Sequence, residues 1–503
     1  MPQTNQNKVG ILLANSTSPF FDSLYAAGNR PSGSGPVLGS GPVLIVAKNG
    51  NDTTGTGSVG APFLTINKAI SVSTLGCTIQ VRANGGAQTT YFESTAGSPY
   101  VPDQTWFEHP AAISMMISGT SVNRCTLMAY PGDEGLVTID GGTTQVGILA
   151  NNHDYWNIYG LRIKNCREEG IVNHGQVPDH IPDLAALSTG WIVENCLVDG
   201  VIGSAGSNVS GIAPWATKDW IVRNCLIKNI DADGGTVASA IQSYGTINLL
   251  VENIETSNVE FGVFLKDHFI STDTPRTPYP GAEVRYCRLN TKASSIHIGI
   301  RGTGSCEAGD QYIHHNLMYG YDGVSLEEAI QCRMQEAEGQ SKRLRVEHNT
   351  IDLGSAIPTH IAVGAFDDFE LNGNIFCDGS LPLRTLGEDA LGIITRLTSC
   401  NRNVYTTFQA ILHSYSPSSF SFPNIASWQA AVSGTPVHLA VSSPDINSVL
   451  SSTTTLFNNR ATRDYTLASG SAALGIMTDS SNAGAYQYGT EVIGLLPTYS
   501  AGT

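Results

Sequence analysis

The sequence predicts an all-β chain wound into a parallel β-helix, a solenoid in which each coil lies on the one before it. At 503 residues the chain exceeds the usual length of one compact domain, which favours either several domains or one elongated repeat array. Charged residues make up only 14% of the chain while glycines number 53, a balance that suits short strands and tight turns. A short apolar pattern also recurs at steps of 25 to 35 residues, which favours the repeat array.

The charge and the hydropathy pattern exclude two classes of partner. The net charge is -16 and no Lys/Arg-rich run interrupts it, so the chain would repel nucleic acid. No stretch approaches the 18 apolar residues of a membrane span, and the N-terminus lacks a basic region followed by an apolar core. We therefore expect no membrane insertion, synthesis in the cytoplasm without an evident signal peptide, and a final location on a virion or outside the cell.

The N-terminal section differs from the rest. Residues 1–42 are low in charge and run into the near-duplicate GSGPVLGSGPVL (Gly33 to Leu44), which reads as a Gly/Pro-rich arm or attachment segment. From Val43 the chain gives a strand, a turn-rich loop and a short amphipathic helix around Leu64 to Val72, which we expect to cap the solenoid. Another strand is expected at Thr78 to Arg82.

The repeat is visible when eight short segments are stacked: WNIYGLRI, WIVENCLV, WIVRNCLI, LLVENIET, AEVRYCRL, QYIHHNLM, LRVEHNTI and FELNGNIF. One column of this alignment holds Leu161, Cys196, Cys225, Ile254, Cys287, Asn316, Asn349 and Asn374. We expect this column to be one interior file, in which asparagine bonds the turning backbone and reduced cysteine fills space.

Each repeat carries a second short strand, beginning at pairs such as Gly147-Ile148, Gly170-Ile171, Gly211-Ile212 and Gly262-Val263. Several short strands per period with no helix between them indicate parallel stacking, with a rise of about 4.8 Å per coil. The β-helix is expected over residues 43–400. Residues 401–503, where the repeat decays, are expected to form C-terminal loops, final coils and a cap.

Three segments resemble the right-handed parallel β-helix superfamily that includes pectate lyases, other polysaccharide lyases and phage tailspikes. Ala47 to Ile70 is similar to the opening turn and cap of these proteins, Leu127 to Gly142 to their first full coil, and Asp464 to Gly489 to their closing segment. The resemblance implies a right-handed coil and, for the spikes, a homotrimer. It does not imply one activity, because this scaffold carries lyases, hydrolases, esterases and adhesins.

Alternation along the Gly-Ile strands predicts an outward-facing column made of His174, Trp215, Tyr244, Lys266, Arg301 and Glu327. The aromatic members would stack on sugar rings and bind substrate, and the cations would hold uronate or sialate carboxylates. In the β-helix polysaccharide lyases that the chain resembles, a lysine or arginine abstracts the proton beside the uronate carboxylate. Lys266 would be this base and Arg301 the stabiliser of the enolate.

Two further chemistries stay open. Asp267, or the pair Asp231 and Asp233, would hold calcium, the one candidate cofactor. A hydrolase would need two converging carboxylates, for which the candidates are Glu327, Glu328, Glu307 and Asp310. We expect His314, His315 and His348 to pack or to bond the ladder rather than to ligate a metal.

Three functions follow from these hypotheses. The first is a virion-associated spike or fibre protein that binds, and in its enzymatic form cleaves, host surface polysaccharide, with residues 1–42 contacting other virion proteins. The second is a free extracellular polysaccharide lyase that acts on a uronate-containing glycan. The third is a purely structural or adhesive β-helix.

Overall fold

The structure is a computed structural model. It describes residues 35–36, 38–96, 110–175, 187–203, 208–233, 237–266, 280–300, 306–308, 310–320, 328–334, 339–354, 359–363, 366–379, 381–385, 397–413, 419–432, 445 and 447–502. Most of the N-terminal segment 1–42 therefore lies outside the described residues. No helix in the described ranges is both long and apolar enough to cross a membrane.

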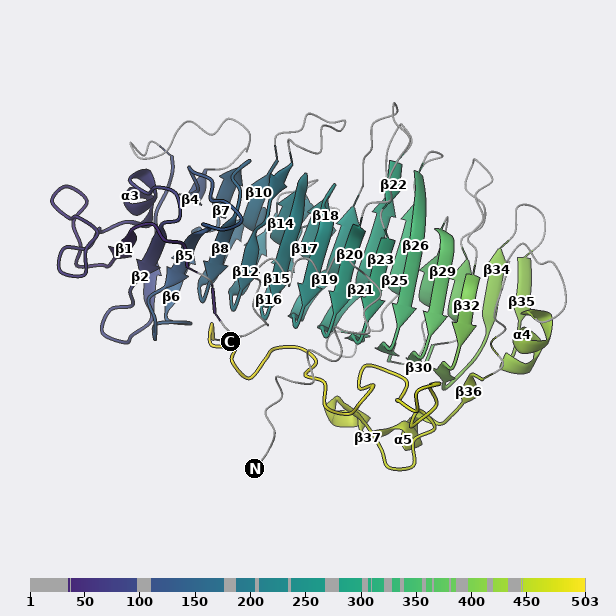
Figure 1. The fold of residues 1–503 in the computed structure, drawn as a ribbon. Coiled ribbons are helices and arrows are strands. Elements are labelled where there is room, and N and C mark those ends of the chain that lie inside the picture. The colour runs from purple at the N-terminus through teal and green to yellow at the C-terminus, as the bar shows by residue number, and fades with distance from the viewer. Residues whose placement is uncertain are drawn as a thin grey trace.

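The chain forms a parallel β-helix whose coils follow one another along a single axis (Figure 1). One face of the coil is the first sheet. Its strands, in order of pairing, are β1 (Val43–Val46), β2 (Thr78–Val81), β5 (Cys125–Ala129), β8 (Trp156–Tyr159), β12 (Ile192–Glu194), β15 (Thr217–Arg223), β18 (Ile247–Glu252), β20 (Pro280–Arg285), β23 (Asp310–His314), β26 (Gly339–Glu347), β29 (Phe366–Asn372) and β32 (Leu397–Asn401). The short strands β11 (Ser188–Thr189) and β22 (Cys306–Ala308) pair with β15 and β26.

Two further ladders complete each coil. The second ladder contains β3 (Thr89–Tyr91), β6 (Val137–Asp140), β9 (Arg162–Arg167), β13 (Leu197–Ile202), β16 (Leu226–Asp231), β19 (Glu255–Lys266), β21 (Arg288–Ile300), β24 (Leu317–Gly320), β27 (Thr350–Asp352), β30 (Ile375–Cys377), β33 (Val404–Tyr405) and β36 (Val449–Leu450). The third contains β4 (Ala111–Ser114), β7 (Val146–Asn151), β10 (Glu169–His174), β14 (Asn208–Trp215), β17 (Val237–Tyr244), the later halves of β19 and β21, β25 (Glu328–Met334), β28 (Thr359–Val363), β31 (Leu381–Thr385) and β34 (Ala410–His413). All pairings within these ladders are parallel, and the predicted right-handed parallel β-helix is confirmed.

Stacking of equivalent positions builds the core. One file through the first sheet is apolar over twelve coils and almost entirely buried: Leu44, Ile79, Leu127, Ile158, Val193, Val222, Val251, Val284, Ile313, Val346, Leu371 and Cys400. β-Branched side chains dominate it because they suit a pleated surface packed on both sides. Within the same core, the indole rings of Trp191 and Trp220 stack face to face with centroids 5.2 Å apart.

The predicted interior file is also confirmed. Cys196 and Cys225 lie on successive coils, Ile254 occupies the next, and Cys287 follows, all of them fully buried. Each of these thiols donates to the backbone of its own and the preceding coil, and the described cysteines are all free and buried. From Asn316 onward the file becomes an amide ladder, in which Nδ2 of Asn316, Asn349 and Asn374 each donates to the Oδ1 of the next asparagine at 3.0 to 3.1 Å.

Helices close the two ends of the coil. The expected capping helix is α3 (Ile66–Ser71), whose N-cap Thr65 accepts a hydrogen bond from Lys68 N at 3.2 Å. Its apolar side packs on β1, β2 and β4. At the other end, α4 (Ile425–Val432) follows the antiparallel strand β35 (Ser419–Phe422), and its Trp428 is buried against Phe422.

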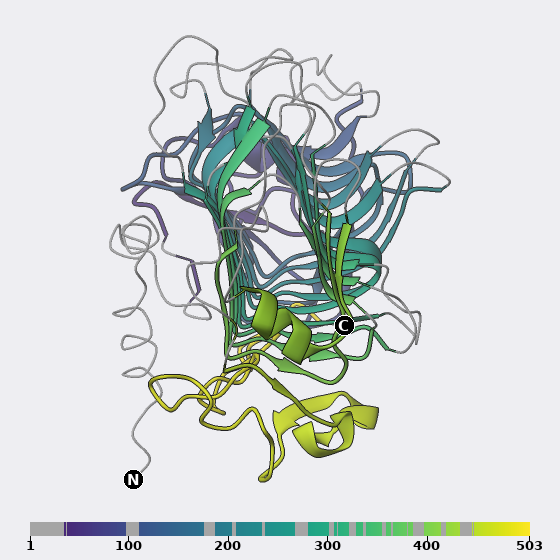
Figure 2. The same cartoon turned by 90° about the vertical axis from the view of Figure 1, so that its right-hand side faces the viewer.

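The last fifty residues leave the coil and return along its side. Strand β36 is followed by α5 (Thr453–Leu456), β37 (Phe457–Asn459), the 3-10 helix η3 (Arg460–Thr462) and β38 (Asp464–Leu467), which lie outside the coil (Figure 2). Residues 468–502, the C-terminal strap, then run back toward the N-terminal coils (Figure 1). Strap contacts recur coil by coil, as when Leu496 N donates to Asn224 Oδ1 and Ser500 N to Asn195 Oδ1, both at 2.8 Å.

Candidate functional site

The outer face of the third ladder brings together the predicted aromatic residues. In register, His174 lies opposite Trp215, and Trp215 lies opposite Tyr244. Ring centroids of His174 and Trp215 are 5.4 Å apart, and those of Trp215 and Tyr244 are 6.0 Å apart. The three rings therefore form a continuous file over three coils, as the alternation of the sequence predicted.

This aromatic file rests on an apolar floor. Leu149, Val172 and Ala213 occupy the preceding outward position of their strands, and Trp215 packs against them. Each of the three rings is half-buried, so each keeps an exposed part. Burial lowers the pKa of His174, which keeps its imidazole neutral near pH 7.

The aromatic surface continues into the next two coils at a position that the sequence did not reveal. Phe264 and His297 stack with ring centroids 4.3 Å apart and planes within 4° of parallel, and Phe261 meets both rings edge-on. They continue the file of Val172 and Ala213, one outward position before the aromatic file. Since the first members of that file are small aliphatic residues, its change to aromatic side chains could be recognised only once the register was known.

The register corrects the cationic end of the predicted column. Lys266 is confirmed as the neighbour of Tyr244. The residue opposite Lys266 is Gly299, however, and the residue opposite Gly299 is Arg333. The predicted places of Arg301 and Glu327 in this column are therefore taken by Gly299 and Arg333, while Arg301 and Glu327 themselves lie outside the described residues. The error arose because the residues in register with Val263 are Ile296 and Ile330, which no glycine precedes, so the Gly-Ile marker did not identify them.

A buried polar group lies on the same face, at the start of its strands. Glu169 is opposite Ser210, whose hydroxyl donates to Oε1 of Gln242 at 2.8 Å. Burial, and then the neighbouring charge of Glu168, raises the pKa of Glu169 well above its ordinary value, so the carboxyl is held as the neutral acid. Glu169 Oε2 and Gln242 Nε2 have no hydrogen-bond partner among the described residues. Glu169 could not be predicted from the sequence, because it follows another glutamate at a turn.

The described residues do not complete the calcium site. Asp231 and Asp233 are exposed, and Asp231 Oδ1 accepts the Asp233 backbone N–H at 2.9 Å in a local turn. No group of three His, Cys, Asp or Glu side chains suited to a metal occurs in the described part of the chain. Asp267 lies outside it, so the calcium hypothesis stays a prediction.

The carboxylates proposed for a hydrolase are placed only in part. Glu328 is nearly buried on the outer face of β25 and accepts a hydrogen bond from Gln331, whereas Asp310 is exposed at the start of β23 in the first sheet. The side chains of Glu307 and Glu327 are outside the described set. Within the described ranges, the two placed carboxylates, Glu328 and Asp310, lie on different sheets and do not form a converging pair.

The three histidines lie at the edge of the first sheet and in the following turn, as predicted. His314 and His315 share a hydrogen bond between their Nδ1 atoms at 2.7 Å, His314 Nε2 meets Glu283 at 3.0 Å, and His315 Nε2 meets Gln487 of the strap at 2.8 Å. His314 and His315 therefore bond each other, a glutamate of the preceding coil and the strap.

The same sheet edge carries a buried ladder of alternating charge, which the sequence analysis missed. Arg223 bonds Glu194 at 3.0 Å, and Arg285 bonds Glu252 at 2.8 Å and Glu283 at 2.5 Å. Burial acts to raise the pKa of Glu283, but the charges of Arg285 and His314 outweigh it and lower the pKa to about 2. Every acid in this ladder meets a cation, so it serves to hold the coils in register rather than to offer a reactive group.

Comparisons with known proteins found solved structures of low similarity. The structure is similar to pectate lyase Pel9A (TM-score 0.40, 12% identity, covering 90% of this chain and 97% of that one) and to a rhamnogalacturonan lyase (TM-score 0.42, 13% identity, 84% and 93%). It is also similar to the GH136 lacto-N-biosidase from Eubacterium ramulus (TM-score 0.35, 11% identity, 74% and 68%). No family model and no curated protein matches the sequence. Likeness at this level carries no inference on substrate or reaction, and the parallel β-helix rests on the strand pairings themselves.

Proposed function

We propose that the protein binds an extended polysaccharide along the outer face of the third ladder. The observation that carries the proposal is the aromatic file His174, Trp215 and Tyr244, three half-buried rings that touch one another over three coils. Sugar rings have apolar faces that pack on aromatic side chains, and a file that repeats once per coil offers such contacts in series along a chain.

A polar side chain also lies beside the aromatic file, buried at the base of this face. Gln242 has a buried amide nitrogen without an acceptor in the described part of the chain, and it lies between Ala213 and Phe264 on the same face. Ligand sites for sugars and other polar molecules combine apolar surface with a few fixed hydrogen-bonding groups. The net charge of -16 favours a ligand held by stacking over one held by charge.

The test is alanine substitution of Trp215 and Tyr244, alone and together. Affinity electrophoresis would be run against dextran, galactan, alginate and polygalacturonate. We expect the wild type to be retarded by at least one of them, each single variant to bind on the order of ten-fold more weakly, and the double variant to lose retardation. Phe92→Ala is the matched control, since Phe92 is 63% exposed on another part of the coil. Retardation that is equal in the wild type and the double variant contradicts the proposal.

As the wider role we propose a virion spike or fibre in which three copies associate. A rigid, elongated coil and a compositionally distinct segment 1–42 support this proposal, because a fibre needs a long shaft and an attachment element. Size-exclusion chromatography with light scattering measures the oligomer directly. A mass of one chain, 53.3 kDa, under native conditions would remove the trimer from the proposal.

One observation favours cleavage by β-elimination as a second candidate. Lys266 continues the aromatic file in register with Tyr244, where a base could act on a bound uronate. Elimination produces an unsaturated sugar that absorbs near 235 nm, so polygalacturonate and alginate provide a direct assay. Lys266→Ala should abolish the signal while it leaves retardation by the polysaccharide unchanged. If no absorbance develops with the wild type, elimination of these two polymers is excluded.

A further inference from the structure

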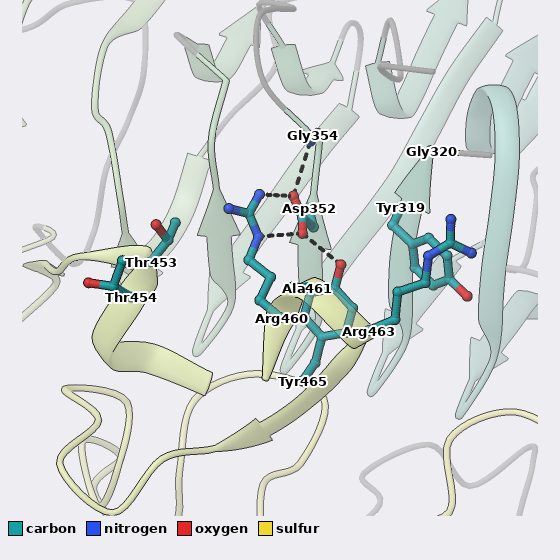
Figure 3. Close-up of a pocket in the computed structure, with 10 residues that line it drawn as sticks. All are labelled: Tyr319, Gly320, Asp352, Gly354, Thr453, Thr454, Arg460, Ala461, Arg463 and Tyr465. Atoms are coloured by element: carbon teal, nitrogen blue, oxygen red, sulfur yellow. Dashed lines mark hydrogen bonds and ion pairs between the residues drawn. The ribbon is translucent and has the colours of Figure 1, made fainter. Parts of the chain in front are cut away.

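A pocket of about 440 Å³ lies between the coil and the C-terminal segment that folds outside it (Figure 3). The coil contributes the ends of β24 and β27, with Tyr319 and Asp352. The C-terminal segment contributes α5, η3 and the start of β38, with Arg460, Arg463 and Tyr465. Its size falls within the usual range of small-molecule sites, about 300 to 1,000 Å³. It lies on the second ladder and is separate from the aromatic file on the third.

The floor of the pocket is a neutralised ion pair. Asp352 accepts hydrogen bonds from Arg460 Nε at 2.7 Å, from the Tyr465 hydroxyl at 2.6 Å and from Gly354 N at 3.0 Å. Burial acts to raise the pKa of Asp352, but the hydrogen bonds and charge of Arg460 lower it below its ordinary value. Arg460 also pairs with Asp378. Asp352 therefore has no acceptor position to spare for a ligand, and the charge of Arg460 is already balanced by two carboxylates.

Arg463 differs from Arg460 in its exposure and in its lack of a carboxylate partner among the described residues. It is exposed, and its guanidinium lies over the Tyr319 ring, 4.8 Å from the centroid. Within the described part of the chain no carboxylate lies at ion-pair distance from it. The Tyr319 ring and hydroxyl fix the cation at the wall of the pocket, and its remaining N–H groups are available for a carboxylate.

The backbone at Arg463 strengthens this reading. Arg463 has a φ of 62° and a ψ of 27°, the left-handed conformation, at the C-cap of η3. A non-glycine residue there costs roughly 1 kcal/mol, and glycine or asparagine would fill the turn more easily. The turn itself therefore does not explain an arginine at this position. What arginine adds, and glycine or asparagine would not, is a guanidinium at the wall of the pocket.

Two threonines line the other side of the pocket, and the Thr454 hydroxyl shares a hydrogen bond with Ser452 Oγ at 2.8 Å. In Figure 3, Thr453 and Thr454 lie on one side of the Arg460 and Asp352 pair, and Tyr319 with Arg463 lies on the other. A ligand that spans the pocket would thus meet a guanidinium at one end and hydroxyls at the other. A uronic acid has this distribution, with a carboxylate at one end and ring hydroxyls at the other.

We propose that this pocket binds a uronate residue, with its carboxylate on Arg463 and its hydroxyls toward Thr453 and Thr454. The site is independent of the polysaccharide-binding face proposed above. The tyrosine rings supply the apolar contact: Tyr319 and Tyr465 lie with centroids 6.0 Å apart and planes within 26°. Arg463 provides the selectivity, because a neutral sugar leaves this guanidinium without an anion.

The test is calorimetric titration of the full chain with sodium glucuronate, with glucose and sodium acetate as comparison ligands. We expect glucuronate to bind, and glucose and acetate each to bind at least ten-fold more weakly. Arg463→Gly removes the cation and at the same time relieves the left-handed backbone, so the thermal midpoint should stay or rise while glucuronate affinity falls at least ten-fold. Arg463→Lys keeps the charge without the fork and should fall between the two.

Two controls separate this site from others. Lys292→Gln removes an exposed cation from β21, outside the pocket, and should leave glucuronate binding unchanged. Trp215→Ala should do the same, even where it abolishes binding of a polysaccharide to the aromatic file. The proposal is overturned if glucuronate does not bind, if Arg463→Gly binds it as the wild type does, or if glucose or acetate binds as tightly.

Discussion

The two halves of the coil place asparagine at different positions of the same turn. In the N-terminal half, Asn195, Asn224 and Asn253 occupy the left-handed turn after the first sheet, with φ between 51° and 55°. The interior file directly after them holds cysteine or isoleucine. In the C-terminal half the arrangement is reversed. The left-handed position holds His315, His348, Gly373 and Arg402, and the interior file holds Asn316, Asn349, Asn374 and Asn403. Between the two halves, Tyr286 is followed by Cys287, whose backbone N–H donates to Asn316 Oδ1 of the next coil at 3.0 Å.

The hydrogen bonds explain why both arrangements close the turn. Cys196 Sγ donates to Glu194 O at 3.3 Å and to Ile158 O on the preceding coil at 3.7 Å. Asn349 Nδ2 donates to the equivalent carbonyls, Glu347 O at 3.0 Å and Ile313 O at 2.9 Å. Only the amide also offers an oxygen, and Asn349 Oδ1 accepts the Asn316 backbone N–H at 3.0 Å.

The difference indicates that the turn takes either a backbone-tolerant residue outside or an asparagine of the following coil whose Oδ1 accepts the interior N–H, as at Cys287, Asn316 and Asn349. Asparagine is among the few residues that adopt the left-handed conformation at low cost. Where asparagine bonds the turn from within, the outer position can hold histidine, tyrosine or arginine. Those side chains, together with glycine, then meet the strap, as His315 does through Gln487.

The largest effect is expected from Asn349→Leu. The substitution keeps the volume but leaves Asn316 N–H, two carbonyls and part of two neighbouring amides unpaired in the interior, for a loss of about 3 kcal/mol or more. In the N-terminal half, Cys225→Ala removes one weak donor and a small apolar volume, for about 1 to 2 kcal/mol. Guanidinium unfolding followed by tryptophan fluorescence compares the two. Equal losses would show that the amide ladder adds nothing to the stacking of the coils.

A smaller effect on stability is expected when the pH is lowered, and it should arise from His348 in the C-terminal half. Burial lowers the pKa of His348 to about 4, while an unfolded histidine titrates near 6.5. Below about pH 6.5 the unfolded chain therefore takes up a proton that the folded chain does not. Stability should fall as the pH drops from there toward 4, by roughly 3 kcal/mol at most from this residue.

His348→Asn isolates this contribution, since asparagine suits the left-handed backbone and does not titrate. Unfolding midpoints at pH 7 and pH 4.5 should differ less in the variant than in the wild type. Glu93 and Asp445, whose pKa values burial raises to about 7 and about 6, act in the opposite sense. They do so in both proteins, so they cancel in the comparison. The same pH dependence in wild type and variant would contradict the assignment.

Much of the coil could be predicted from the sequence because the side chains of its interior recur once per coil. The stacking of Cys196, Cys225 and Cys287 and the aromatic file His174, Trp215 and Tyr244 followed from alternation and spacing alone. The arrangement of the C-terminal segment could not be predicted in the same way. Its contacts join residues far apart in sequence, such as Ser500 with Asn195, and no repeat relates them.

The candidate site was predicted in part for the same reason. Files with one kind of side chain are visible in an alignment, whereas files that change character are not. The step from Ala213 to Phe264 and His297 needed the observed register, as did the replacement of Arg301 by Gly299 opposite Lys266. The pocket at Arg463 depends on the fold of residues 453–465 against the coil, which local sequence patterns do not encode.

The smallest effect is expected where two roles of asparagine in the N-terminal half are separated: its tolerance of the left-handed backbone and its hydrogen bond to the strap. Asn224→Gly keeps the left-handed turn without steric cost but loses the hydrogen bond from Leu496 N, for about 1 kcal/mol. Asn224→Ala loses the same bond and also forces a Cβ into the left-handed region, which should add about 1 kcal/mol more. Guanidinium midpoints for the two variants measure the difference. If they coincide, backbone tolerance is not what selects asparagine here, and the bond to the strap alone explains it.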